Sequence, residues 1–144
     1  MLIKTLEVIH YPADGSTASG EPWERLLYPD PTRGEIEKAL ARLDRDVYPY
    51  LWLHISDFIE DDPPRHALNV LGGLGEYAIS IELPRRQLEY LDETRGETVV
   101  DIWVSDQGSQ SEERNLCNDY GLVLKIVRHF AETGEAFPGV NWAE

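Results

Sequence analysis

HALNVLGGLGEYAISIEL (66–83) is the stretch that decides the fold of this chain, because it contains two short apolar segments around a glycine-rich turn. In residues 76–83 the apolar side chains recur at every second position, which is the period of a β-strand with one buried face. These apolar positions are Tyr77, Ile79 and Ile81. Residues 66–73 are predicted to form the preceding strand, and the glycines between the segments favour a tight hairpin turn. The centre of the chain is therefore predicted to be a β-hairpin.

Further strands are predicted on both sides of this hairpin. Residues 2–10 and 50–58 are rich in branched and aromatic side chains, residues 98–105 (TVVDIWVS) form a clear strand pattern, and residues 86–92 form a weaker one. Polar stretches that contain Gly, Pro or Asp separate these strands and are predicted to be loops or turns. They are residues 11–22, 28–31, 61–64, 93–97 and 106–115.

Two helices are predicted, one before and one after the main run of strands. Thr32 and Glu35 have the spacing of a capping box, so a helix should begin there, and it should end before Tyr48-Pro49. A second helix is predicted over about residues 119–133, and Gly134 is a good C-terminal stop. The apolar faces at helical spacing are Ile36, Ala39, Leu40 and Leu43 in the first helix, and Leu122, Val123, Ile126, Val127 and Phe130 in the second.

Consecutive strands between two helices predict the α+β class, with an antiparallel, meander-type sheet and an N-terminal and a C-terminal helix packed on it. The length of 144 residues is close to the commonest domain size, so residues 1–144 are expected to form a single domain. The segment FPGVNW (137–142) follows the second helix. We expect Trp142 to fold back onto the sheet or the helix, because burying its large apolar surface would hold this segment in place.

The charge of the chain limits the partners that it can have. There are 27 acidic and 13 basic residues, a net charge of −14, and residues 57–119 alone hold 15 acidic and 5 basic residues. A protein this acidic lacks the positive charge that binding to nucleic-acid phosphates requires. It would attract a basic partner, and would attract it quickly. The alternative reading is that the acidity serves only solubility.

The sequence predicts neither a metal site nor a cofactor site. Its four histidines are isolated and form no paired ligand motif, and Cys117 is the single cysteine. The glycines of residues 72–77 precede a strand and not a helix N-terminus, so they do not match a phosphate-binding loop. Since no secretory signal and no apolar run of membrane-spanning length is visible, we expect a cytoplasmic protein without a disulfide.

The C-terminal part of the chain resembles a known family. A strand with a glycine loop, VVDIWVSDQG (99–108), is followed by a helix that ends in F-x-x-T-G, LVLKIVRHFAETG (122–134), and then by FPGVNW (137–142). This pattern is similar to that of the first-numbered immunity family of bacterial polymorphic toxin systems. The resemblance covers residues 66–144, and its clearest part is the final helix with Pro138, Val140 and Trp142.

The resemblance implies a small α+β protein, not an enzyme, that binds one cognate toxin and keeps it harmless inside the producing cell. The toxins of such systems are often nucleic-acid deaminases, whose clefts tend to be basic because they hold a polyanion. We therefore expect a basic protein toxin as the partner, with no direct binding to nucleic acid or membrane. The candidate toxin-binding residues are Tyr90, Asp92, Glu93, Asp101, Trp103, Asp106, Glu112 and Glu113.

Several alternatives stay open from the sequence. Strand alternation places Asp101, Trp103 and Ser105 on one face and Ile102 and Val104 on the other, which is expected to be the core. Trp103 would then point outward as an anchor, unless it packs under a helix on a sheet that is covered on both faces. The chain could also be a regulatory or ligand-binding module, with an apolar pocket and converging polar groups, or a hydrolase with two paired carboxylates. The oligomeric state is not predicted.

Overall fold

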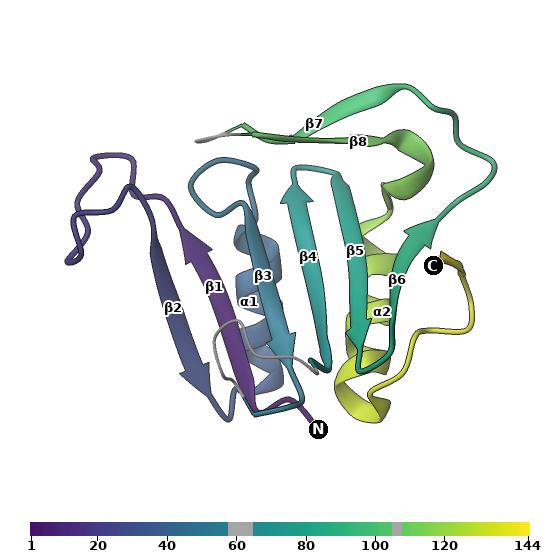
Figure 1. Ribbon diagram of the computed structural model, residues 1–144, viewed down its shortest axis with the longest axis horizontal. Coiled ribbons are helices and arrows are strands. Elements are labelled where there is room, and N and C mark those ends of the chain that lie inside the picture. The colour runs from purple at the N-terminus through teal and green to yellow at the C-terminus, as the bar shows by residue number, and fades with distance from the viewer. Residues whose placement is uncertain (58–64, 105–107) are drawn as a thin grey trace.

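The computed structural model describes residues 1–57, 65–104 and 108–144, which form a large sheet, a small sheet and two α-helices (Figure 1). The large sheet has the strand order β2-β1-β3-β4-β5-β6-β9, and all its neighbouring strands are antiparallel. Its strands are β1 (Thr5–His10), β2 (Glu24–Pro29), β3 (Tyr50–His54), β4 (Ala67–Gly73), β5 (Glu76–Leu83), β6 (Arg86–Leu91) and β9 (Asn141–Ala143). The small sheet pairs β7 (Val99–Trp103) with β8 (Ser109–Glu112). The predicted α+β class with an antiparallel sheet is confirmed.

The central hairpin forms as its sequence pattern predicts. β4 and β5 pair in the register Val70↔Ile79, and the alternate residues Tyr77, Ile79 and Ile81 are buried. Leu74 and Gly75 make the turn, with φ angles of 52° and 93°. Two successive residues with positive φ are the mark of a type I′ turn, whose twist matches that of the strands it joins.

Both helices begin where the sequence indicates, and α2 also ends there, whereas α1 ends at Arg42, several residues before the predicted limit at Tyr48-Pro49. α1 (Arg33–Arg42) has the predicted capping box, in which the Thr32 side chain accepts from the Glu35 amide at 3.1 Å and Glu35 accepts from the Thr32 amide at 3.0 Å. α2 (Tyr120–Thr133) starts after Asp119, whose carboxylate accepts from a backbone amide of the first turn. Gly134 ends α2 in the left-handed conformation, with φ 74°.

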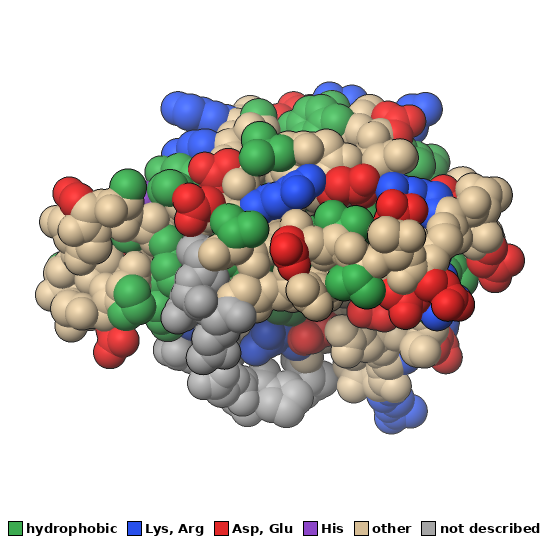
Figure 2. All heavy atoms as spheres, turned by 90° about the horizontal axis from the view of Figure 1, so that it is seen from above, with side chains coloured by type: hydrophobic (Ala, Val, Ile, Leu, Met, Phe, Trp, Pro, Cys, Tyr) green, Lys and Arg blue, Asp and Glu red, His purple; other side chains and the backbone are tan. Residues whose placement is uncertain are grey.

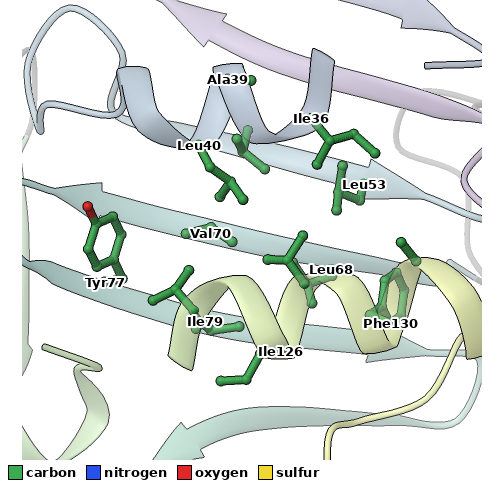
Figure 3. Close-up of a cluster of buried hydrophobic side chains, with 14 of the residues drawn as sticks. Ile36, Ala39, Leu40, Leu53, Leu68, Val70, Tyr77, Ile79, Ile126 and Phe130 are labelled. Atoms are coloured by element: carbon green, nitrogen blue, oxygen red, sulfur yellow. The ribbon is translucent and has the colours of Figure 1, made fainter. Parts of the chain in front are cut away.

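Both helices lie against the same face of the large sheet (Figures 1 and 3). In Figure 3, Ile36 and Leu40 of α1 and Ile126 and Phe130 of α2 point toward the sheet. On this face of the sheet, every second residue along a strand is apolar, and these side chains are 6% exposed or less. The residues concerned include Leu6, Val8, Leu51, Leu53, Leu68, Val70, Tyr77, Ile79, Ile81, Leu88 and Tyr90. Because apolar burial is the dominant favourable term in folding, this face holds the molecule together.

A close backbone contact joins the end of β4 to the loop after α1. Gly73 forms an isolated antiparallel bridge with Asp44, and its φ is 130°. A Cβ at this position would overlap the carbonyl oxygen of Leu43 and would lie 2.7 Å from the Asp44 nitrogen. Only glycine allows the two segments to approach this closely.

Three short strands were not predicted. β2 contains ERLLYP, and the turn predicted at residues 28–31 begins only after Pro29. β8 lies within residues 106–115, which were predicted to be a loop, and the 3₁₀ helix Glu113–Asn115 follows it. β9 has three residues. β2 and β8 each pair with the strand that precedes them in the chain, and β9 pairs with the distant β6. None of the three shows the period-two apolar pattern by which the other strands were predicted. The turn predicted at residues 61–64 lies outside the described residues.

The C-terminal segment folds back as expected. β9 pairs with β6 in the register Tyr90↔Trp142, and the two rings meet edge to face with centroids 6.4 Å apart. The indole Nε1 of Trp142 donates to the Phe137 carbonyl at 3.0 Å. Trp142 is half-buried against the core, so it joins the end of the chain to the last long strand of the sheet.

Replacing this tryptophan should loosen the β6–β9 edge. We expect Trp142→Ala to lower the free energy of unfolding by about 2 kcal/mol, through lost apolar burial and an aromatic contact. In thermal unfolding this corresponds to a fall in Tm of roughly 4–8 °C. Asn141→Ala is the matched control, because Asn141 is exposed in the same strand and should leave Tm nearly unchanged. Equal melting temperatures for the wild type and Trp142→Ala would contradict this account.

Candidate functional site

The β7–β8 hairpin lies across one end of the large sheet, where the β4–β5 turn is also found (Figure 1). We call this end of the molecule the apical surface. It consists of the loop after α1, the β4–β5 turn, the segment from β6 through β7, and β8 with the 3₁₀ helix. The corresponding residues are 44–48, 72–76, 92–104 and 109–115.

Arg45 connects three of these segments. Its guanidinium donates to the carbonyl oxygens of Gly73 at 2.8 Å and of Leu74 and Asp101 at 3.3 Å. Its own carbonyl accepts from the Val104 amide at 2.8 Å. Arg45 adopts a φ of 68°, which is uncommon for a residue with a side chain. Hydrogen bonds from a charged donor are among the stronger ones, so Arg45 holds the hairpin to the β4–β5 turn.

The prediction that Trp103 points outward is wrong. β7 is irregular between Asp101 and Trp103, where Ile102 has no partner of its own in β8. Such a bulge interrupts the alternation of side chains. Ile102 and Trp103 are therefore both turned toward the molecule, whereas Asp101 and Val104 are exposed. The prediction that Val104 belongs to the core is wrong for the same reason, since its side chain is 60% exposed.

Trp103 packs over the sheet face that carries no helix, which also differs from the alternative of a tryptophan beneath a helix. Its ring meets Tyr50 and Tyr11 edge to face, at centroid distances of 5.4 and 5.8 Å. Below it is an open cleft of about 270 Å³. Its lining residues are Tyr50, Trp52, Asn69, Leu71, Trp103 and Ser109. The cleft is apolar with a few polar groups, which is the composition of a binding pocket for a small group.

The acidic candidate residues form two groups. Asp92, Glu93, Glu112 and Glu113 come together, because the Asp92 amide donates to the Arg114 carbonyl and the Glu113 amide donates to the Thr98 carbonyl. Thr94 donates to the Asp92 carboxylate from its hydroxyl and its amide, and these bonds hold the pKa of Asp92 below its ordinary value. Asp101 lies farther along the hairpin and accepts from the Gln110 amide group at 2.8 Å.

The last two candidates, Tyr90 and Asp106, add no described side chain to the apical surface. Tyr90 is 5% exposed and packs in the core beneath the helices, so its side chain offers almost no surface to a partner. Its position follows from the alternation of β6, in which Leu88 and Tyr90 share the inward face. Burial raises the pKa of Tyr90 above its ordinary value. Asp106 lies outside the described residues.

The apical surface is strongly acidic. Its segments hold nine acidic and three basic residues. Figure 2, which looks onto this end, shows red side chains at several places, with blue and green ones among them. All three arginines have partners within the molecule. Arg95 pairs with Glu76 at 3.0 Å, Arg114 pairs with Glu112 at 2.6 Å, and Arg45 binds carbonyl oxygens. The acidic side chains are Asp44, Asp46, Glu76, Asp92, Glu93, Glu97, Asp101, Glu112 and Glu113.

Sequence reasoning missed the exposed apolar side chains of this surface. Leu74 is 72% exposed, Val104 is 60% exposed and Val99 is 56% exposed, and these are the three most exposed large hydrophobic residues of the described chain. The Leu-Gly pair at the predicted turn was the available signal for Leu74. The exposure of Val104 depends on the bulge, which has no local sequence mark.

A buried ionic cluster lies on the helix-free face of the sheet. Glu7 is 5% exposed and His54 is 2% exposed, and Glu7 binds the Nε2 of His54 at 2.8 Å and the Nε of Arg25 at 2.7 Å. Burial opposes the charge of Glu7, but the hydrogen bonds and charges of His54 and Arg25 outweigh it and hold the Glu7 pKa below its ordinary value of 4.5. Burial and the Glu7 charge raise the pKa of Tyr50 at the neighbouring cleft.

Within residues 1–57, 65–104 and 108–144, no group of three or more His, Cys, Asp or Glu side chains is arranged to hold a metal ion. Cys117 is buried, and burial raises the pKa of its thiol. In the same described part of the chain, neither helix combines the length and apolar character that crossing a membrane requires.

No family model and no curated protein sequence matches this chain. Its fold is similar to that in a crystal structure of a hypothetical protein from Neisseria gonorrhoeae, with a TM-score of 0.55. The alignment covers 96% of this chain and 94% of that chain, at 12% sequence identity. At this identity the similarity concerns the fold alone.

Glu7 should make the stability of the protein depend on pH. Because its pKa is lower in the folded state, its stabilising effect is present above the unfolded-state pKa and is lost as the pH falls through the folded-state pKa. We expect Glu7→Gln to lower the free energy of unfolding by about 2 kcal/mol or more near neutral pH, since it weakens a buried ion pair. The deficit should shrink below about pH 4.

The measurement is urea unfolding of both proteins across this pH range. Glu89→Gln is the control, because Glu89 is exposed on the same sheet and its removal should change stability little at any pH. If the difference in free energy of unfolding between the wild type and Glu7→Gln stays constant as the pH falls to its lowest value, the assigned ion pair is contradicted.

Proposed function

We propose that this protein is an immunity protein that binds and neutralises a basic, nucleic-acid-acting toxin, such as a deaminase, and catalyses no reaction itself. The acidity of the apical surface carries this proposal. This surface has nine acidic residues and three arginines, so it carries an excess of negative charge. All three arginines already bind partners within the molecule. At the opposite end of the sheet the β5–β6 turn carries Arg85 and Arg86, of which Arg86 pairs with Glu144.

The proposed mode of action is occlusion of the toxin's active-site cleft. A cleft that holds a polyanion is basic, and an acidic surface of fixed shape competes for the same positive charges. The resemblance of residues 66–144 to the immunity family supports this mode. Its clearest segments belong to the scaffold, since α2 packs on the large sheet and β9 pairs with β6. Electrostatic attraction would also speed association, which suits a protein that must reach its toxin before damage occurs.

The first test is co-expression with the product of the adjacent reading frame. We expect that product to stop growth alone, and we expect this protein to restore growth and to form a complex with it. Affinity should fall at least about tenfold when the salt concentration rises from about 0.05 M to about 0.5 M, because salt screens exposed charges. A non-toxic neighbour, or a toxic one that this protein neither binds nor suppresses, would count against the proposal.

A charge-reversal pair tests which end binds. Glu93→Lys/Glu97→Lys changes two exposed apical residues, and Glu132→Lys/Glu135→Lys makes the same change in net charge at the far end of α2. The apical variant should weaken binding to the toxin by about tenfold or more, mostly through slower association, and the control should weaken it much less. Equal losses for both variants would show that net charge matters and the apical surface does not.

A second candidate function, a small ligand-binding module, is favoured by the cleft beneath Trp103. Its volume of about 270 Å³ is slightly below that of common ligand pockets, and Tyr50, Trp52 and Trp103 supply aromatic walls. If the cleft holds a small molecule, that molecule should quench tryptophan fluorescence and raise the melting temperature of the wild type but not of Trp103→Ala. A compound screen without such a hit would leave the immunity proposal in the stronger position.

A further inference from the structure

We infer that Leu74 and Val104 form the apolar centre of the surface with which this protein contacts its toxin. The inference rests on the proposed function and names the residues that would anchor the complex. Both side chains project from the apical surface, and both residues are bonded to Arg45 through their backbones. No candidate contact drawn from the sequence included either of them.

The exposure of these residues is the first observation. At 72% and 60% exposed, Leu74 and Val104 leave more of their side chains in water than any other large hydrophobic residue of the described chain, and Val99 on the same hairpin is next. Single exposed hydrophobic residues are common, but these three gather at one end of the molecule. Apolar groups amid charged ones make up the usual anatomy of a protein-binding surface.

The backbone at Leu74 gives a second reason. Leu74 occupies the first central position of a type I′ turn with φ 52°, where Asn, Asp and Gly are favoured and leucine is not. The Leu74 side chain does not offset the cost of this backbone conformation by packing into the core, since most of it is exposed. The fold therefore gains nothing from leucine at this position, whereas a bound partner would bury it.

The surface is held ready for binding. Arg45 fixes the β4–β5 turn and the end of β7 through five hydrogen bonds, and Gly73 holds the same turn close to the loop after α1. Side chains on fixed elements lose less conformational entropy on binding than side chains on mobile loops. Leu74 and Val104 are thus displayed in a preset arrangement.

The negative charge around Leu74 and Val104 determines which kind of partner can bind there. The apical segments hold nine acidic residues, so a second copy of this chain would bring like charges together across the same surface. An anionic membrane surface would be repelled for the same reason. A basic protein with an apolar site beside its positive charges is the partner that this surface complements.

Leu74→Asn separates binding from folding. Asparagine suits the turn, so the melting temperature of this variant should equal or exceed that of the wild type. Its affinity for the purified toxin domain from the adjacent reading frame, measured by calorimetry, should fall by about tenfold or more. Val104→Ser should weaken binding in the same direction. Leu27→Asn is the matched control, since Leu27 is 46% exposed on β2 at the edge of the sheet and should leave the affinity unchanged.

The outcomes separate the two proposals. If the wild type binds the toxin domain and Leu74→Asn and Val104→Ser bind with the same Kd, the anchor is overturned and the immunity function stands. If the wild type forms no complex even at low salt and gives no growth rescue, the proposed function fails and this inference fails with it. A loss of affinity in Leu27→Asn as large as that in Leu74→Asn would also overturn the anchor.

Discussion

The arrangement of the apical surface depends on one side chain, the guanidinium of Arg45. Its hydrogen bonds to the carbonyls of Gly73, Leu74 and Asp101 join segments that are far apart in the sequence. Within the β7–β8 hairpin, β8 contains only polar residues, and of the apolar residues of β7 only Ile102 is fully buried. A two-stranded hairpin is marginal when isolated, so its position requires contacts to the rest of the molecule. The cleft beneath Trp103 and the display of Val104 both follow from this attachment.

The two faces of the large sheet have different physical tasks. One face is uniformly apolar and is covered by both helices, so burial alone explains its composition. The other face carries tyrosine, tryptophan and asparagine around the cleft, and below them the Glu7–His54–Arg25 cluster. A buried ion pair rarely adds stability over an apolar alternative, although removing one partner is costly. The chain therefore maintains a polar arrangement on this face that folding by itself does not require.

The sequence predicted the parts of the fold that depend on local pattern. The alternation of β5, the capping box at Thr32 and the stop at Gly134 are set by neighbouring residues, and the structure confirms all three. β2, β8 and β9 lack a period-two apolar pattern and are defined by their pairing with β1, β7 and β6, so local periodicity missed them. The candidate site shows the same division. The acidity and the clustering of Asp92 with Glu113 follow from composition and strand order, whereas the orientation of Trp103 depended on a bulge that the alternation rule assumes to be absent.

Gly73 gives the apical surface a hidden sensitivity. Its missing side chain is what lets β4 run against Leu43 and Asp44, and the residue after Asp44 is the arginine that carries the hairpin. A single added methyl group would push the loop away and would tilt the whole end of the molecule, although Gly73 is itself buried and faces no partner. In a genetic screen for loss of partner recognition, this glycine would score beside true contact residues. A map of such mutations on the molecular surface would not explain the effect at Gly73, because that effect comes from the close spacing of two backbone segments.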